Sequence, residues 1–103
     1  MNYGYIPKVV QVIPKRDYHV IVYFDDGKIV EKDMSEHLAN GIVFEPLNDP
    51  DTFVKTCCVL NDTLAWDLEG KRHPYNAIDL DPIALYELPS ANAIYANEDR
   101  LAV

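Results

Sequence analysis

The sequence predicts an α+β domain: a mostly antiparallel sheet of about five strands in hairpins, with one or two short helices completing a two-layer arrangement. Three observations lead to this prediction. Runs of β-branched residues alternate with turn residues, an Asp-Asp-Gly segment lies between two such runs, and Asp-Pro pairs mark helix starts. The 103 residues fit a single domain, in which we expect residues 1–8 to be an N-terminal extension, 9–88 the folded core and 89–103 a C-terminal tail.

The first third of the chain predicts three strands. Residues 9–13 are rich in valine and isoleucine and are closed by Pro14, and residues 18–24 form a second run of this kind. Residues 25–28, Asp-Asp-Gly-Lys, supply the turn of a hairpin whose second strand spans residues 29–33. This is the clearest hairpin in the sequence.

The period of two predicts two different faces for the strand within residues 18–24. The apolar face consists of Val20, Val22 and Phe24. The opposite face carries His19, Ile21 and Tyr23, and its apolar content is high enough that we expect it to be covered.

Two helix starts follow the hairpin. Asp33 and Glu36 resemble a capping pair, so we expect a short helix over residues 34–40 that ends at Gly41. Residues 49–50, Asp-Pro, then begin a brief helical turn.

A second hairpin is predicted in the middle of the chain. Residues 55–60 indicate a fourth strand, residues 61–62 are a turn, and residues 63–66 form the returning strand, with Trp66 buried or at its rim. Residues 69–74 are polar and predict a surface loop.

The last third predicts one helix and a tail. Asp81 and Pro82 repeat the cap-then-proline signal before residues 83–88, which place Leu85 and Leu88 on one face. Residues 90–103 form either a frayed tail or a docking arm.

The order of several of these segments resembles a known family. They are residues 18–27, residues 47–49, Phe53, Trp66 and residues 79–86. Over about residues 9–87 the chain is similar to the bacterial domain of unknown function family 2442, small uncharacterised α+β proteins. The resemblance implies an accessory or antitoxin-like protein, and it supplies no catalytic residue to carry over.

Composition narrows the classes of function. The net charge of −8 argues against direct binding of nucleic acid and against anionic membrane surfaces. The first eight residues lack the pattern of a signal peptide and no run has membrane-spanning length, so we expect a cytoplasmic protein. The four glycines are isolated, which gives no phosphate-binding loop, and we expect no cofactor.

Our first hypothesis is a small protein-interaction or regulatory accessory module that binds a protein partner or a second copy of itself. The chain has seven tyrosines, a residue type enriched in protein interfaces. The candidate contact residues are His19, Ile21 and Tyr23 on the strand face, together with Tyr75.

Two alternatives remain open. A metal-assisted hydrolase would need Asp79, Asp81 and His73 to converge on an ion that activates water, although aspartates of this kind also serve as turn and cap residues. A small-ligand-binding domain would need an enclosed apolar pocket, for which a chain of this size has little room. Because no catalytic motif is present, we expect a protein that is not an enzyme and has no metal site. Cys57 and Cys58 are adjacent on a predicted strand, which disfavours a disulfide between them.

Overall fold

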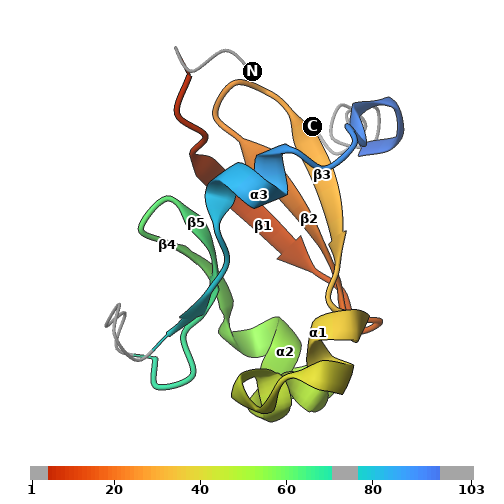
Figure 1. Cartoon of the computed structure of the whole chain (residues 1–103), viewed down its shortest axis with the longest axis vertical. Helices are drawn as coiled ribbons and strands as arrows, with labels where there is room; N and C mark the ends of the chain where they lie inside the picture. The colour runs from red at the N-terminus through yellow and green to blue at the C-terminus, as the bar shows by residue number, and fades with distance from the viewer. Residues whose placement is uncertain (1–4, 71–76, 96–103) are drawn as a thin grey trace.

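Two three-stranded antiparallel sheets form the framework of the chain in the computed structural model, which describes residues 5–70 and 77–95 (Figure 1). The first sheet has the order β1-β2-β3 and consists of β1 (Val9–Pro14), β2 (His19–Phe24) and β3 (Ile29–Asp33). The second sheet has the order β4-β5-β6 and consists of β4 (Cys57–Leu60), β5 (Thr63–Trp66) and β6 (Ile78–Asp79).

Short helices accompany the two sheets, which confirms the α+β class. They are α1 (Ser35–Asn40), the 3-10 helix η1 (Ile42–Asn48), α2 (Pro50–Thr56) and α3 (Pro82–Tyr86). Among the described residues, no helix has the length and apolar content needed to cross a membrane.

The predicted helix starts are largely confirmed. The Asp49 side chain accepts a hydrogen bond from the Asp51 amide at 3.1 Å, and Asp81 accepts one from the Ile83 amide at 2.9 Å. Both aspartates therefore occupy the N-cap position ahead of a proline, where a side-chain oxygen satisfies an unpaired amide. The first helix begins at Ser35, whose amide donates to Asp33 at 2.9 Å.

The expected single sheet of about five strands and the two-layer arrangement are not confirmed. The described residues form two sheets, and the sixth strand pairs Trp66 with Ile78 and Ala65 with Asp79. A strand of two residues is too short for alternation to reveal it. The two sheets meet near a hydrogen bond in which the Val9 amide donates to the Asp62 carbonyl at 2.9 Å. In the described part of the chain, they do not share a ladder of paired strands.

The predicted strand over residues 55–60 begins too early. Lys55 and Thr56 end α2, where the Thr56 hydroxyl donates to the Thr52 carbonyl at 2.8 Å. The strand begins at Cys57. The β-branched character of Thr56 therefore yields to the helix that Asp49 has already started.

Both predicted hairpins form, each with the backbone that its turn residues favour. Gly27 has φ 97° between β2 and β3, a conformation that glycine adopts without strain. Asn61 and Asp62 have φ 53° and 63° between β4 and β5, and these are the side chains that best tolerate the left-handed region.

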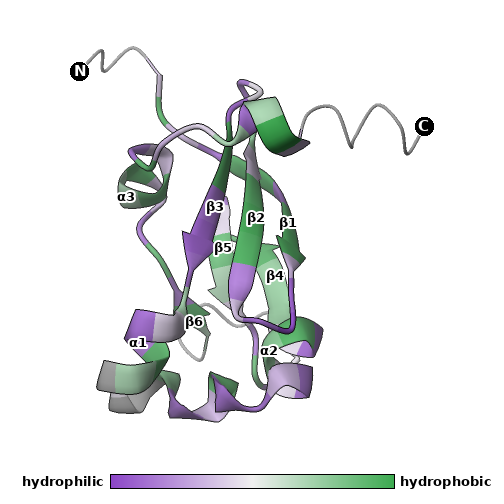
Figure 2. Cartoon of the chain, turned by 90° about the vertical axis from the view of Figure 1, so that its right-hand side faces the viewer, coloured by the Kyte–Doolittle hydropathy of each residue, from purple (hydrophilic) through white to green (hydrophobic). Residues whose placement is uncertain are grey.

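One apolar core joins the two sheets and the helices. The predicted apolar face of β2 lies in this core, with Val20 and Val22 fully buried. Trp66 of β5 is also fully buried, and its indole nitrogen donates to the Phe53 carbonyl at 3.1 Å. Figure 2 shows the second sheet lying behind the first, with α1 and α2 gathered at one end of the molecule.

Residues 91–95, the described part of the expected tail, pack on the first sheet. Residues 92–95 form a helical turn at the end of the sheet opposite α1 and α2 (Figures 1 and 2). The Ala91 amide donates to the Ile29 carbonyl at 2.7 Å, and the Ile29 amide donates to the Asn92 side chain at 2.8 Å. The turn is thereby fixed to the outer edge of β3.

Candidate binding pocket

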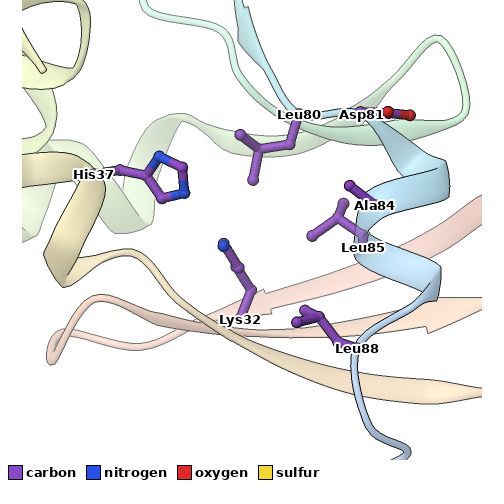
Figure 3. Close-up of a pocket in the computed structure, with 7 residues that line it drawn as sticks. All are labelled: Lys32, His37, Leu80, Asp81, Ala84, Leu85 and Leu88. Carbon is purple, nitrogen blue, oxygen red and sulfur yellow. The ribbon is translucent and has the colours of Figure 1, made fainter.

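A pocket of about 230 Å³ lies between β3, α1 and the segment around α3 (Figure 3). Lys32 enters it from β3 and His37 from α1. The facing wall comes from the later part of the chain and consists of Leu80, Ala84, Leu85 and Leu88. Segments that are far apart in the sequence therefore build one site.

The polar side of the pocket is basic. Figure 3 shows the Lys32 ammonium group and the His37 ring both directed into the space between the three segments. Within the described residues, neither side chain has a carboxylate within ion-pair distance. Asp81 also lines the pocket, but its carboxylate is directed away from both groups and caps α3.

The apolar side belongs partly to the core. Leu85 is 3% exposed and packs in the core cluster, while Leu80 and Leu88 are half-buried against it. Ala84 is exposed at the mouth of the pocket. This wall is therefore buried at its base and exposed at its rim.

The position of His37 is fixed by the end of α1. The Gly41 amide donates to the His37 carbonyl at 3.0 Å, and the His37 ring packs against Phe44 with centroids 5.2 Å apart. A Cβ at Gly41 would lie 2.8 Å from the Phe44 ring, closer than real contacts allow. Glycine thus ends the helix as predicted, here because it permits a close approach rather than a left-handed turn.

The predicted contact residues on β2 lie on one face, but this face is largely occupied by the chain itself. Ile21 is 6% exposed and packs with Ile29 beneath Tyr95. Tyr23 packs at the edge of this cluster, and His19 is half-buried. The fourth candidate, Tyr75, lies outside the described residues.

A hydrogen-bonded cluster holds Tyr95 over this face. The Tyr95 hydroxyl donates to one Glu31 oxygen at 2.5 Å, and the Lys15 ammonium donates to the other at 3.3 Å. The hydrogen bond from Tyr95, reinforced by Lys15, lowers the pKa of Glu31. The same hydrogen bond raises the pKa of Tyr95, because only the protonated phenol can donate it.

The proposed metal ligands do not form a site within the described residues. Asp79 lies exposed on β6, Asp81 caps α3, and His73 is outside the described part of the chain. No group of three or more potential ligands gathers among residues 5–70 and 77–95.

Cys57 and Cys58 lie at the start of β4, and neither forms a disulfide within the described residues. Burial raises the pKa of the Cys57 thiol to about 12, with a smaller contribution from Cys58. A thiol of this kind stays protonated near neutral pH, so Cys57 lacks the thiolate that nucleophilic chemistry needs.

Sequence reasoning missed the residues that build the pocket. One signal for Lys32 was present, because the period of two places it on the same face of β3 as the fully buried Val30. A lysine beside a core position indicates an ammonium group at the edge of an apolar space. The contributions of His37 and Leu88 depend on tertiary packing, for which the sequence has no comparable local signal.

These features define a class: a small α+β domain whose described residues form two antiparallel sheets and an amphipathic pocket. The chain belongs to the family described as "Protein of unknown function (DUF2442)", whose model matches residues 9–89. This match confirms the resemblance predicted from the sequence. Neither a curated protein nor a solved structure matches the chain.

Proposed function

We propose that this protein is a small protein-interaction module and that the pocket between β3, α1 and α3 is its docking site. The single observation that supports this function is the pair of nitrogen-bearing groups, Lys32 and His37, which face an apolar wall with no carboxylate of the described residues within ion-pair distance. A regulatory accessory role of the antitoxin-like kind is the form of this function that the family resemblance suggests.

The energetics of the pocket favour an added partner. An ammonium group at the edge of an apolar space loses part of its hydration, and a carboxylate supplied by a partner would compensate for that loss. The leucine wall offers apolar surface that a partner side chain can remove from water. A combination of a few placed polar groups with an apolar lining is typical of binding sites.

The pocket is a better candidate than the face first predicted on β2. The turn of residues 92–95 covers Ile21 and satisfies the edge of β3, so a partner would have to displace an existing contact there. Self-association through His19, Ile21 and Tyr23 therefore stays a prediction that ranks below docking at the pocket.

Filling the pocket provides the test. Ala84 is exposed at the mouth, so Ala84→Trp places an indole there without disturbing the core. We expect a tagged wild-type protein to retain a partner from lysate of its native cells at moderate salt, and Ala84→Trp to lose that partner, as measured by mass spectrometry of the retained proteins.

A matched control separates occlusion from a general effect of tryptophan. Ala39→Trp makes the same change at an exposed position of α1 that does not line the pocket. Circular dichroism of all three proteins verifies folding. The proposal fails if no protein is retained by the wild type, or if Ala84→Trp retains the same proteins as Ala39→Trp.

A further inference from the structure

The two sides of the pocket differ in chemistry, and this difference specifies the kind of group that fits. Lys32 and His37 present nitrogen atoms on one side, and Leu80, Leu85 and Leu88 present only carbon on the other (Figure 3). A complementary group must therefore carry negative charge and an aliphatic part within one residue of each other.

We propose that the pocket binds the carboxyl-terminal residue of a partner protein. The terminal α-carboxylate would contact Lys32 and His37, and an aliphatic side chain on the same residue would pack against the leucine wall. This inference rests on the proposed function and names the part of the partner that docks. A lysine ammonium has three donors and a carboxylate has two acceptor oxygens, so the pairing gives charge-assisted hydrogen bonds.

The size of the pocket supports a single residue. Its volume of about 230 Å³ is smaller than the range of about 300–1,000 Å³ in which drug-sized ligands bind. A side chain of glutamate or aspartate would satisfy the basic groups but has no branched aliphatic part for the leucines. A terminal leucine, isoleucine or valine supplies both parts from one Cα.

The donor set favours a carboxylate over a phosphate group. Phosphate carries up to two charges and is commonly recognised by arginine side chains with several parallel donors. Arg16 is paired with Asp51 on another part of the surface and does not line the pocket. One ammonium group and one imidazole match the single charge of a carboxylate.

The charge of the whole chain indicates the remaining character of the partner. A net charge of −8 attracts basic proteins over long distances and repels acidic ones. Within this acidic chain, the pocket places the Lys32 ammonium group beside the His37 ring, while the Asp81 carboxylate, which caps α3, also lines it. We therefore expect a basic partner that ends in an aliphatic residue with a free carboxylate.

Short peptides test the inference directly. The probe is the acetylated tetrapeptide Lys-Ser-Gly-Leu with a free carboxylate. The control peptide has the same sequence and ends in an amide. A third peptide, acetylated Lys-Ser-Gly-Glu ending in an amide, offers only a side-chain carboxylate. Titration of the ¹⁵N-labelled full chain follows the backbone amides of Lys32, His37 and Leu85 by nuclear magnetic resonance.

We expect the free leucine peptide to shift these amides and both amidated peptides to bind about tenfold more weakly. Lys32→Met should weaken the affinity for the leucine peptide with a free carboxylate by about tenfold. Lys55→Met, which removes an exposed lysine outside the pocket, should leave this affinity unchanged. The inference is overturned if the amidated leucine peptide binds equally well, if the glutamate peptide binds best, or if no peptide shifts these amides at concentrations up to about 10 mM.

The two experiments fail separately. Loss of a partner from Ala84→Trp, together with no preference for a free carboxylate, would retain the interaction function and reject the carboxyl-terminal ligand. Selective binding of the free peptide, together with an unchanged set of retained proteins for Ala84→Trp, would retain the ligand chemistry and reject the proposed function.

Discussion

The two faces of β3 differ in what their side chains contact. Glu31 and Lys32 are neighbours on this strand and project to opposite sides, as the period of two requires. Glu31 accepts hydrogen bonds from Tyr95 at 2.5 Å and from Lys15 at 3.3 Å. Lys32 faces the pocket and has no carboxylate of the described residues within ion-pair distance.

On the Glu31 face, the chain supplies the contacting side chains itself. On the Lys32 face, the described residues leave a pocket. Tyr95, from the docked turn, supplies both a ring over Ile21 and a hydroxyl for Glu31. The pocket also combines an apolar wall with a charged group, as the Glu31 face does, but no side chain of the described residues fills it. An apolar sheet face is thus weak evidence for an interface until the segments that cover it are known.

The largest effect is expected when the cover of the outer face is removed. Tyr95→Ala eliminates the ring on Ile21 and Ile29 together with the hydrogen bond to Glu31, and we expect the free energy of unfolding to fall by about 2 kcal/mol. Urea unfolding followed by the fluorescence of Trp66, the single tryptophan, measures this change. Hydrogen exchange at the Ile29 amide should accelerate, because its acceptor Asn92 belongs to the same turn.

Ile94→Ala is the matched control for this prediction. Ile94 lies on the same turn but is 58% exposed, so its truncation should change the free energy of unfolding by less than about 0.5 kcal/mol. Equal losses from the two variants would contradict the role of Tyr95 as the cover of the face.

A smaller and pH-dependent effect is expected when only the hydroxyl is removed. Tyr95→Phe keeps the ring on Ile21 and Ile29 and should cost about 1 kcal/mol near pH 7. The pKa of Glu31 is lowered in the fold, so this stabilisation is present above its ordinary pKa of 4.5 and is lost as the pH falls through the folded value. The pKa of Tyr95 is raised above 10.0, so the same contribution is lost as the pH rises through its folded value.

Urea unfolding of the wild type and Tyr95→Phe from pH 3 to pH 11 measures the difference between them. We expect the difference in free energy of unfolding to be constant near neutral pH and to shrink at both ends of this range. When both proteins also carry Glu31→Gln, the decrease at acidic pH should disappear. A difference that stays constant down to pH 3 would show that the hydroxyl does not act through the Glu31 carboxylate.

The same contrast shows which parts of the structure the sequence could predict. The faces of β2 followed from alternation, since Val20 and Val22 are buried in the core and Ile21 lies on the other side. The packing of Tyr95 over the Ile21 face could not be predicted, because Tyr95 and Glu31 are 64 positions apart and no local pattern connects them. Local rules specify which surface is apolar, whereas long-range packing decides what is placed on it.

The pocket was unpredictable for a related reason. Asp81 was correctly identified as a cap, and this role explains why its carboxylate is directed away from Lys32 and His37. The convergence of those two groups depends on how α1 and α3 pack beside β3. From residue types alone, a metal site of Asp79, Asp81 and His73 was an open alternative to the expectation of no metal site; Asp81 caps α3, and His73 lies outside the described residues.

The smallest change in stability is expected for Lys32→Met. Because Lys32 forms no ion pair in the described residues and adjoins leucine side chains, a methionine should change the free energy of unfolding by no more than about 0.5 kcal/mol. Glu31→Met on the opposite face should cost about 1 kcal/mol, because Tyr95 and Lys15 both lose their acceptor.

Urea midpoints of these two variants at pH 7 therefore compare the faces of β3 directly. Equal costs would mean that Lys32 supports the fold as Glu31 does, which would remove the distinction between a satisfied face and an open one. An unchanged midpoint for Lys32→Met would assign any loss of peptide binding in that variant to the missing ammonium group, because the pocket around it would still be folded.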